Sequence, residues 1–482
     1  MPLFRDQWRV VDGPMTALVV ATLAMGFFFG GSPIGPGPAL LAFVATGLIT
    51  LVVAVLRGAL RVKVRWTVRV FVLLVAIFPF LQVVPLPYGV WMALPGHEVA
   101  RASIEAAGLA GHWLPWSVAP LETLICCLLV FPLLGVFLGT MLLGDDDVDL
   151  VFLAIGIMAL VGLCVGVIQV ATAGTQLRFY ERADHRYLLG FFTNKNHSAT
   201  FLTAGLLILT YFIHRLPLAA ATRWLTLGGA TVLVFAAILA TNSRAGLALG
   251  GLAALWCAAS LLAHRAIKVK WLVLGMAAAM ALGVGLVSAS SVAGRSVQRY
   301  GEIGNDRRWT IWTDTMVATR EYFPLGSGMG SFVPVYRTAE PLASVNPRYA
   351  NRAHNDYLEL ALEGGLPVIA LIVAFLGLWG RLGYGALTRA AARAPRQRRG
   401  RPTGAVADRC SAQALVGGGT ILLILLHSIM DYPLRTMIWS ALTAFSFALL
   451  VRVAPTGHAV QDERRGSSGT PDDDPAVYGI RS

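Results

Sequence analysis

The sequence contains few charged residues for its length. Asp, Glu, Lys and Arg make up 13% of the 482 residues, whereas hydrophobic residues make up 56%. Soluble domains carry about 25% charged residues. A globular core cannot bury so much apolar surface, so most of it must face lipid. The apolar runs are continuous rather than alternating, which favours membrane-spanning helices over a transmembrane barrel.

Cysteine is also scarce, with five residues in the chain. None of them has the spacing of a zinc site, and we infer neither a disulfide nor a structural metal. The loops expected on the outer face of the membrane contain no tight pair of acidic residues that would suit a divalent cation. We therefore expect no metal and no cofactor.

Twelve apolar runs are long enough to span a membrane, which takes roughly 20 residues in a helix. They lie at 15–31, 38–56, 68–84, 121–143, 149–171, 198–214, 224–241, 246–263, 271–290, 357–380, 413–430 and 437–453. The first run is not followed by a clear small-residue cleavage site, so we interpret it as a span and not as a signal peptide. The sequence therefore predicts an all-α, polytopic membrane protein with about 12 transmembrane helices.

Lysine and arginine predict the orientation of these spans. With the N-terminus in the cytoplasm, the cytoplasmic loops contain the basic stretches 57–69, 215–223, 265–270 and 381–409. An even number of spans then places both termini inside. We interpret the net charge of +13 as a sign of this topology and of attraction to anionic membrane lipids. Nucleic-acid binding is not expected, because the basic residues are scattered over the loops.

Four regions follow from this layout. Residues 1–290 hold the first nine transmembrane helices, 291–356 form a large periplasmic loop, and 357–453 hold the last three helices, with a basic cytoplasmic linker at 381–412. Residues 454–482 are rich in Gly, Ser and Asp and read as a disordered cytoplasmic tail.

The loop at 291–355 is the one long segment that we expect outside the membrane. It is rich in Trp, Tyr and Phe, which suggests a folded cap and not a loose tether. The stretch Arg308–Met316 looks helical, and Pro324 with the glycines after it ends that pattern.

Three polar clusters lie where spans meet the outer face: Arg186–His197, Thr241–Arg244 and Asn351–Glu359. Polar residues at membrane boundaries are costly and often mark a site or a pathway. All three clusters are expected on the side of the cap, so we expect them to approach one another.

The run His354–Pro367, HNDYLELALEGGLP, resembles the signature of the O-antigen ligase and polymerase superfamily. Its position between a long periplasmic loop and a late helix is also similar. Further stretches that resemble family elements are Gly190–Asn196, Thr241–Gly246, Arg308–Trp312, Pro324–Gly330 and His427–Arg435. The resemblance covers about residues 185–440. It departs from the family pattern at Pro367-Val368, where many members have a further glycine, so the geometry of the tenth helix is open.

The resemblance implies a GT-C-like glycosyltransferase of the bacterial inner membrane with its active site facing the periplasm. Such an enzyme transfers a glycan from an undecaprenyl-pyrophosphate donor to an acceptor hydroxyl, with inversion and without a metal. Arginine suits the leaving pyrophosphate, because it is permanently charged and can bind phosphate oxygens in pairs. Histidine suits the acceptor proton, because its ordinary pKa lies near working pH.

The resemblance carries these roles to particular residues. It assigns the base to His354 and the pyrophosphate to Arg244 and Arg308, with Arg307 competing for the role of Arg308. Further candidates for pyrophosphate binding are Arg352, Arg186, Lys195 and Asn196.

Each candidate also has a structural interpretation. His354 could cap the tenth helix, Arg244 could anchor that part of the chain at the interface, and Arg308 could pair with a nearby aspartate. The candidates in the loop before the sixth span could simply order that loop. We interpret His197 and Asp431 as structural, and the glycine pair of HNDYLELALEGGLP as a place of close helix approach.

Several functions remain open on the sequence. The acceptor could be the lipid A core, as in a ligase, or another lipid-linked repeat, as in a polymerase, and we rank these two equally. A protein hydroxyl, as in an oligosaccharyltransferase, ranks lower. A transporter of a small anion is the alternative from another class. Transporters often show inverted repeats and broken helices at the midplane, and neither is clear here. A purely structural scaffold does not explain the charged boundary residues.

Overall fold

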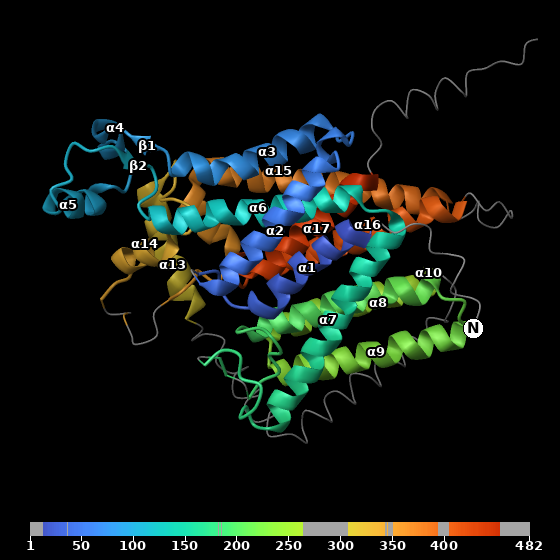
Figure 1. Ribbon diagram of the computed structural model, residues 1–482. Coiled ribbons are helices and arrows are strands. Elements are labelled where there is room, and N and C mark those ends of the chain that lie inside the picture. The colour runs from blue at the N-terminus through green and yellow to red at the C-terminus, as the bar shows by residue number, and fades with distance from the viewer. Residues whose placement is uncertain are drawn as a thin grey trace, which may run out of the picture.

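Helices form most of the chain in the computed structural model, which describes residues 13–35, 37–181, 183–184, 186–263, 307–342, 345, 350–393 and 404–453. The long apolar helices are α1 (Gly13–Phe29), α2 (Pro38–Leu56), α3 (Trp66–Gln82), α6 (Pro120–Leu142), α7 (Asp145–Ala171), α8 (Lys195–Arg215), α9 (Ala220–Thr241), α10 (Arg244–Ala263), α15 (Asp356–Arg393), α16 (Gly404–His427) and α17 (Met437–Val453). Figure 1 shows α1, α2, α3, α6, α15 and α17 side by side, with α8, α9 and α10 along one flank.

These helices agree with the expected spans. Seven are long and apolar enough to cross a membrane, and α1, α3, α10 and α17 contain shorter apolar helices. Together they match every expected span except 271–290, which lies outside the described residues. The prediction of an all-α, polytopic membrane protein is confirmed.

Local sequence explains where several helices begin. Proline occupies the first turn of α2 and of α6, where its missing N–H and fixed φ cost nothing. At the start of α8, the side chain of Asn194 accepts a hydrogen bond from the amide of Asn196 at 2.9 Å, which is an N-cap. Three aspartates fill the first turn of α7, where they favour the positive end of the helix dipole.

The centre of the bundle lies where α1, α8 and α17 meet. Phe27 of α1 packs on Phe201 of α8 with ring centroids 4.9 Å apart, and Phe201 packs on Trp439 of α17 at 5.7 Å. All three side chains are buried. The residues just before α8 and α17 are therefore attached to the most tightly packed helices of the molecule.

The expected helical cap is present at one end of the bundle, here called the cap end. It consists of α13 (Arg308–Tyr322), α14 (Phe332–Ala339) and the segment that leads into α15. Its own small core includes Ile311 and Phe332. The helix over Arg308–Met316 is confirmed, and the chain leaves helical structure at Phe323, next to Pro324.

A second extramembrane element lies between α3 and α6, so the expectation of only one long segment outside the spans is wrong. Strand β1 (Pro85–Leu86) pairs antiparallel with β2 (Leu114–Pro115), and helices α4 (Tyr88–Met92) and α5 (Glu98–Ala106) lie between them. Figure 1 shows this element at the cap end, beyond α13 and α14. Backbone hydrogen bonds join it to the cap, including Val118 N to Ser327 O at 3.0 Å.

The cap is also joined to α15 at a kink. Gly365 has φ 57° and ψ −148° inside this long helix. A Cβ atom at Gly365 would lie 2.2 Å from the carbonyl oxygen of Pro324, so only glycine fits here. The amides of Ser327 and Gly328 donate to carbonyls of Leu362 and Glu363 at 3.0 and 2.9 Å. Gly365 therefore admits the cap loop, whereas a Cβ atom at Gly364 would lie 3.3 Å from the ring of Phe78 in α3, which is the close helix approach expected for this glycine pair.

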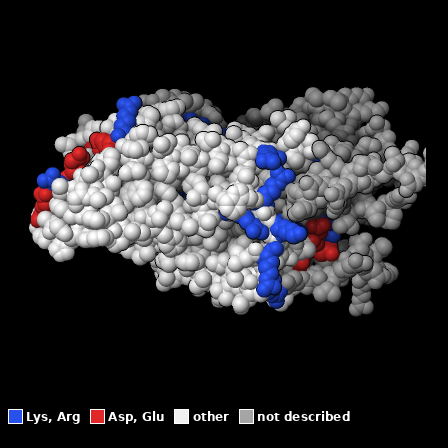
Figure 2. Space-filling model, turned by 90° about the horizontal axis from the view of Figure 1, so that it is seen from above, with Lys and Arg blue, Asp and Glu red and all other residues white. Residues whose placement is uncertain are grey.

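Charged side chains gather toward the two ends of the molecule. Figure 2 shows a broad uncharged belt between the charged tip at the cap end and a band of Lys and Arg farther along. Such a belt is what a bilayer requires of a helical bundle.

At the end opposite the cap, ion pairs connect α7 to the last two helices. Arg409 contacts Asp146 and Asp149, each at 2.5 Å, and Arg452 contacts Asp145 at 3.2 Å. We call these five residues the opposite-end cluster. It fastens the start of α7 to α16 and α17.

Candidate active site

His354 lies in the turn that links the cap to α15. Its φ of 53° is a left-handed conformation that is uncommon outside glycine and often accompanies a functional position. Trp312 Nε1 donates to the carbonyl of Ala353 at 2.9 Å, and the amide of Ala353 donates to Glu359 Oε2 at 2.9 Å. The imidazole is 25% exposed, so its backbone is fixed while its side chain stays accessible.

The buried carboxylate of Asp431 binds this imidazole. Asp431 lies between α16 and α17, and its Oδ1 is 3.1 Å from His354 Nδ1. Its Oδ2 accepts hydrogen bonds from the side-chain amides of Asn194 at 2.8 Å and Asn196 at 2.6 Å. The amide of Tyr432 donates to Oδ1 as well, at 3.1 Å. Four N–H groups therefore surround the carboxylate.

These contacts keep Asp431 ionised. Burial alone would raise its pKa, but the hydrogen bond from His354 and the nearby imidazoles of His427 and His197 hold the pKa of this carboxyl well below its ordinary value. An ionised carboxylate only accepts hydrogen bonds, so His354 Nδ1 carries the hydrogen of this bond. In the neutral form of this imidazole the lone pair then lies on Nε2. Nε2 can therefore receive a proton from a bound hydroxyl.

A chain of hydrogen bonds connects this pair to Arg244. Asn196 Oδ1 accepts from the hydroxyl of Ser243 at 2.6 Å, and Ser243 Oγ accepts from the amide of Gly246 at 2.8 Å. Ser243 thus caps α10, whose first residue is Arg244. Both ends of the Asn196 side chain are used within the protein, so it positions neighbouring groups. This contrasts with its expected role as a pyrophosphate ligand.

The helix that begins at Arg308 is attached to the same turn. Trp312 follows Arg308 by one turn of α13, and its indole binds the carbonyl that precedes His354. Arg307 lies just before α13 and pairs with Glu340 at 3.8 Å. The elements that carry Arg244, Arg308 and His354 therefore meet at the cap end.

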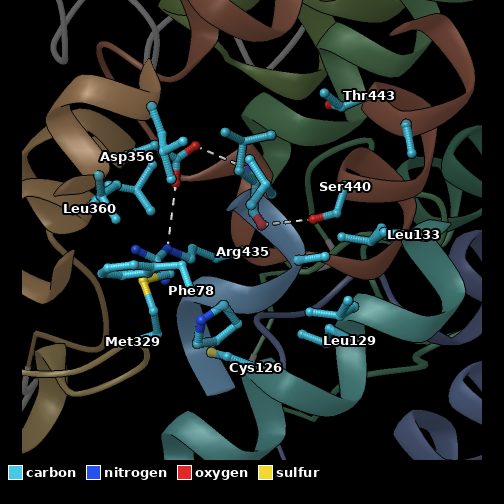
Figure 3. Close-up of a pocket in the computed structure, with 18 of the residues that line it drawn as sticks. Phe78, Cys126, Leu129, Leu133, Met329, Asp356, Leu360, Arg435, Ser440 and Thr443 are labelled. Carbon is cyan, nitrogen blue, oxygen red and sulfur yellow. Dashed lines mark hydrogen bonds and ion pairs between the residues drawn. The ribbon is translucent and has the colours of Figure 1, made fainter. Parts of the chain in front are cut away.

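Arg352 belongs to a buried network beneath His354. It contacts Glu359 at 3.0 Å, and Arg435 contacts Glu359 at 3.2 Å and Glu363 at 2.7 Å. Asp356 lies 3.8 Å from Arg435. Figure 3 shows Arg435 beside Asp356, with Phe78 and Met329 near its other side. We call the five charged residues the cap-end cluster. It contains three carboxylates and two guanidinium groups.

The other loop candidates lie apart from this network. Arg186 makes a two-pronged ion pair with Asp184, at 2.8 and 2.9 Å, on the exposed surface. Lys195 Nζ lies 4.6 Å from the ring centre of Tyr187. Both contacts order the loop before α8, in line with the structural interpretation of these residues.

One group among the described residues has the composition of a metal site. His197, His427 and Asp431 each offer a ligand atom, and these atoms lie within 4.8 Å of one another. Both oxygens of Asp431 already accept hydrogen bonds from nitrogen donors. We therefore interpret the group as the packed support of the His354–Asp431 pair.

Part of this site lies in a segment that resembles a known protein family. Residues 229–373 match the family model described as O-Antigen ligase. This segment is similar to the O-antigen ligase family. No curated protein matches the chain at a significant level. The match supports a membrane enzyme of the glycosyltransferase type that acts in O-antigen ligase or polymerase chemistry.

The matched segment contains part of the candidate site. Arg244, Arg308 and His354 all lie within the matched residues, on α10, on α13 and in the turn before α15. Asn196 and Asp431 lie outside the match. The matched segment therefore depends on α8 and on the α16–α17 connection for the groups that position its histidine.

The sequence predicts the candidate residues but not their partners. Asp431 reads as structural from the sequence, and Arg435, Glu359 and Glu363 are not among the predicted site residues. A signal was present, because Glu359 and Glu363 are four residues apart on a predicted span and buried charges need partners. The identity of the partner, 72 residues beyond Glu363, was not readable without the fold.

Proposed function

We propose that this protein transfers a glycan from an undecaprenyl-pyrophosphate donor to an acceptor hydroxyl on the periplasmic face of the bacterial inner membrane. The observation that carries the proposal is His354, accessible to solvent and bound through Nδ1 to the buried carboxylate of Asp431. A histidine held in this way is a general base whose tautomer and orientation are fixed.

The reaction follows from this arrangement. The acceptor hydroxyl gives its proton to His354 Nε2 while its oxygen forms a bond to the anomeric carbon of the donor glycan. The bond from that carbon to the pyrophosphate breaks, and the pyrophosphate keeps the electron pair. Attack from the face opposite the leaving group inverts the anomeric centre. The carboxylate of Asp431 stabilises the imidazolium that forms.

Arginine side chains balance the charge of the leaving pyrophosphate. Arg244 and Arg308 begin helices that are attached to the His354 turn through Asn196 and Trp312. Guanidinium groups bind phosphate oxygens in pairs and remain charged at any working pH. Because they provide the positive charge, we propose that the transfer proceeds without a metal.

The acceptor is identified by testing candidate substrates and not by the fold. A lipid A core acceptor would make the protein a ligase, and a second lipid-linked repeat would make it a polymerase. Both acceptors present a sugar hydroxyl, so they require the same base. The alternatives of a protein acceptor and of anion transport are tested in the same experiment.

The test uses the purified full-length protein in detergent with a lipid-pyrophosphate glycan and each candidate acceptor. We expect transfer by the wild type and loss of transfer in His354→Ala by roughly 10²–10⁴-fold, the range that a positioned base contributes. His112→Ala is the matched control, because His112 is exposed on the element between α3 and α6, and it should retain full activity. Anion flux in liposomes without any glycan transfer would contradict the proposal.

A further inference from the structure

Three tryptophans have strongly exposed side chains in the part of the chain that the structure describes. Trp66, Trp113 and Trp309 are 76%, 66% and 54% exposed. Trp66 begins α3 at the end opposite the cap, because Gln82 at the other end of α3 donates to the carbonyl of Glu363. Trp113 lies in the element between α3 and α6. Of the three, Trp309 lies on the helix that is bonded to the turn carrying the proposed base.

Two contacts join Trp309 to the proposed base. Its ring packs on the ring of Trp312, with centroids 5.0 Å apart. Trp312 Nε1 in turn donates to the carbonyl of Ala353 at 2.9 Å, and Ala353 directly precedes His354 in the chain. A ligand that covers the ring of Trp309 therefore lies close to the turn that carries the imidazole.

The packing of Trp309 leaves aromatic surface uncovered. The planes of its ring and the Trp312 ring meet at 74°, which is an edge-to-face contact. Such a contact covers at most one of the two faces of each ring. Among the described residues, the core of the cap takes Ile311 and Ala318 from α13 and not Trp309, so packing of the cap does not account for this ring. Trp309 therefore presents a flat, rigid surface to solvent at the cap end.

The surroundings of Trp309 suit a sugar ring better than a lipid chain. Thr310 and Thr313 are exposed beside it, and Thr313 Oγ1 donates to the carbonyl of Trp309 at 2.9 Å, which leaves its oxygen able to accept. A pyranose has a face of C–H groups, whose slight positive charge matches the negative face of an aromatic ring. Its hydroxyls bind the threonine hydroxyls and the indole N–H at the rim. An aromatic ring with hydroxyl neighbours therefore serves as a platform for a carbohydrate.

The geometry of the reaction decides which sugar occupies this platform. In the proposed transfer, the first sugar of the donor is bonded directly to the pyrophosphate. Arg308, a proposed ligand of that pyrophosphate, immediately precedes Trp309 in α13. The acceptor hydroxyl attacks the opposite side of the anomeric carbon, so its glycan approaches from the side away from the pyrophosphate. We propose that Trp309 stacks against the first sugar of the donor glycan, an inference that rests on the proposed function.

Replacements of Trp309 test this assignment in steady-state kinetics with the purified full-length protein and a lipid-pyrophosphate glycan. We expect Trp309→Ala to raise KM for the donor by roughly 5–150-fold, the range for the loss of one stacking contact on an aromatic ring. The value of kcat should change little, because the contact is the same in the ground state and in the transition state. The KM for the acceptor should not change, because the acceptor lies on the other side of the anomeric carbon.

Two further variants separate stacking from packing. Trp309→Phe keeps an aromatic face and should stay near the wild type in donor KM. Trp309→Leu keeps an apolar side chain against Trp312 but has no aromatic face, so it should resemble Trp309→Ala. Trp66→Ala removes an exposed tryptophan at the opposite end of the molecule and is the matched control, which should leave both KM values unchanged.

A lipid without a sugar isolates the contact further. Undecaprenyl pyrophosphate has the chain and the pyrophosphate of the donor, so it should inhibit transfer in competition with the donor. Trp309→Ala should leave its inhibition constant unchanged, whereas Arg308→Ala should weaken both the inhibition and the binding of the donor. If Trp309→Ala weakens the inhibition as much as it raises the donor KM, Trp309 acts on the pyrophosphate or on the fold, and the sugar platform is wrong.

The outcomes also separate this inference from the proposed function. Absence of transfer by the wild type would contradict the function itself. With an active wild type, an unchanged donor KM in Trp309→Ala would overturn the sugar platform and leave the function intact. Wild-type behaviour of Trp309→Leu, or an increase confined to the acceptor KM, would do the same.

Discussion

The cap-end cluster and the opposite-end cluster each contain three carboxylates and two arginines, yet they differ in two ways. The carboxylates of the cap-end cluster have no exposed side-chain surface, whereas Asp145 and Asp146 of the opposite-end cluster are 20% and 27% exposed. The cap-end cluster also adjoins an accessible histidine and an apolar cavity between α3, α6, α15 and α17, whereas the opposite-end cluster joins helix ends.

The difference shows that ion pairs alone do not identify an active site in a membrane protein. Both clusters hold helices together, and both would appear as charged residues near predicted spans. The cap end is distinguished by what adjoins its charges, namely a histidine bound by a buried carboxylate and an apolar cavity between four helices. Five predictions test this contrast, in order of expected effect.

The largest effect on stability is expected from Arg435→Met. Removing this guanidinium leaves Asp356, Glu359 and Glu363 buried with one remaining arginine. Breaking a buried ion pair on one side costs about 3–5 kcal/mol, so the variant should unfold at a clearly lower temperature in detergent. A second change, Glu363→Gln, should recover part of the loss. If Arg435→Met unfolds like the wild type, the cluster does not stabilise the cap end.

The largest effect on turnover without loss of the histidine is expected from Asp431→Asn. An amide has one acceptor oxygen, so it cannot accept hydrogen bonds both from the two asparagines and from His354 Nδ1, and the imidazole would lose its fixed orientation. We expect kcat to fall on the order of 10²-fold, at the lower end of what a general base contributes, with little change in KM. Asp184→Asn, on the exposed loop, is the control. An effect confined to KM would argue against a positioning role.

The next prediction compares two neighbouring arginines, Arg307 and Arg308. Hydrogen bonds to charged groups contribute roughly 1.5–3 kcal/mol, so Arg308→Ala should lower kcat/KM by about 10–150-fold. Arg307→Ala should have a smaller effect, because Arg307 is paired with Glu340. Arg244→Ala should resemble Arg308→Ala. Steady-state kinetics with the lipid-pyrophosphate donor measure all three, and the reverse order for Arg307 and Arg308 would reassign the pyrophosphate ligand.

The opposite-end cluster should behave differently. Arg409→Ala removes the partner of Asp146 and Asp149, and we expect a loss of about 1–3 kcal/mol in stability with unchanged kcat and KM for the protein that remains folded. Arg101→Ala, in a surface pair with Glu105, should change neither. A loss of kcat in Arg409→Ala under conditions of full folding would break the contrast between the two ends.

The smallest effect is on the pH dependence of stability. The folded pKa of Asp431 lies well below its ordinary value, and the unfolded value is about 3.9. A lowered carboxyl pKa stabilises the fold above the unfolded value, and this contribution is lost as pH falls through the folded value. The difference in unfolding temperature between wild type and Asp431→Asn should therefore be steady above about pH 5 and should shrink below about pH 4. A difference that grows on acidification would contradict the sign.

Much of the fold was predictable because membrane spans can be recognised from their apolar composition. The span expected at 38–56 coincides with α2, and most others differ by only a few residues. The element between α3 and α6 was missed because its strands are two residues long and its helices span only five and nine residues. The kink at Gly365 was not predicted either, because it arises from the cap loop pressing on α15 from outside the helix.

The candidate site was predictable only in part. His354, Arg244 and Arg308 stood out through a resemblance to a family and through their place at the ends of spans. Asp431 did not, because its importance comes from a contact across 77 residues of chain. The apolar cavity between α3, α6, α15 and α17 could not be predicted at all. It is formed jointly by these four helices, and the sequence of each one is that of an ordinary apolar span.

The attachment of the cap to α15 has a consequence for how fast such a protein can work. Three backbone hydrogen bonds at 2.8 to 3.0 Å and the contact at Gly365 join the loop 324–328 to the kinked helix. A cap fastened in this way cannot swing aside as a gate without breaking those bonds. In the proposed reaction, the lipid-linked donor would then arrive by two-dimensional diffusion within the leaflet. The encounter rate would depend on the surface density of donor and on the viscosity of the membrane, and turnover would slow when the lipid phase stiffens on cooling.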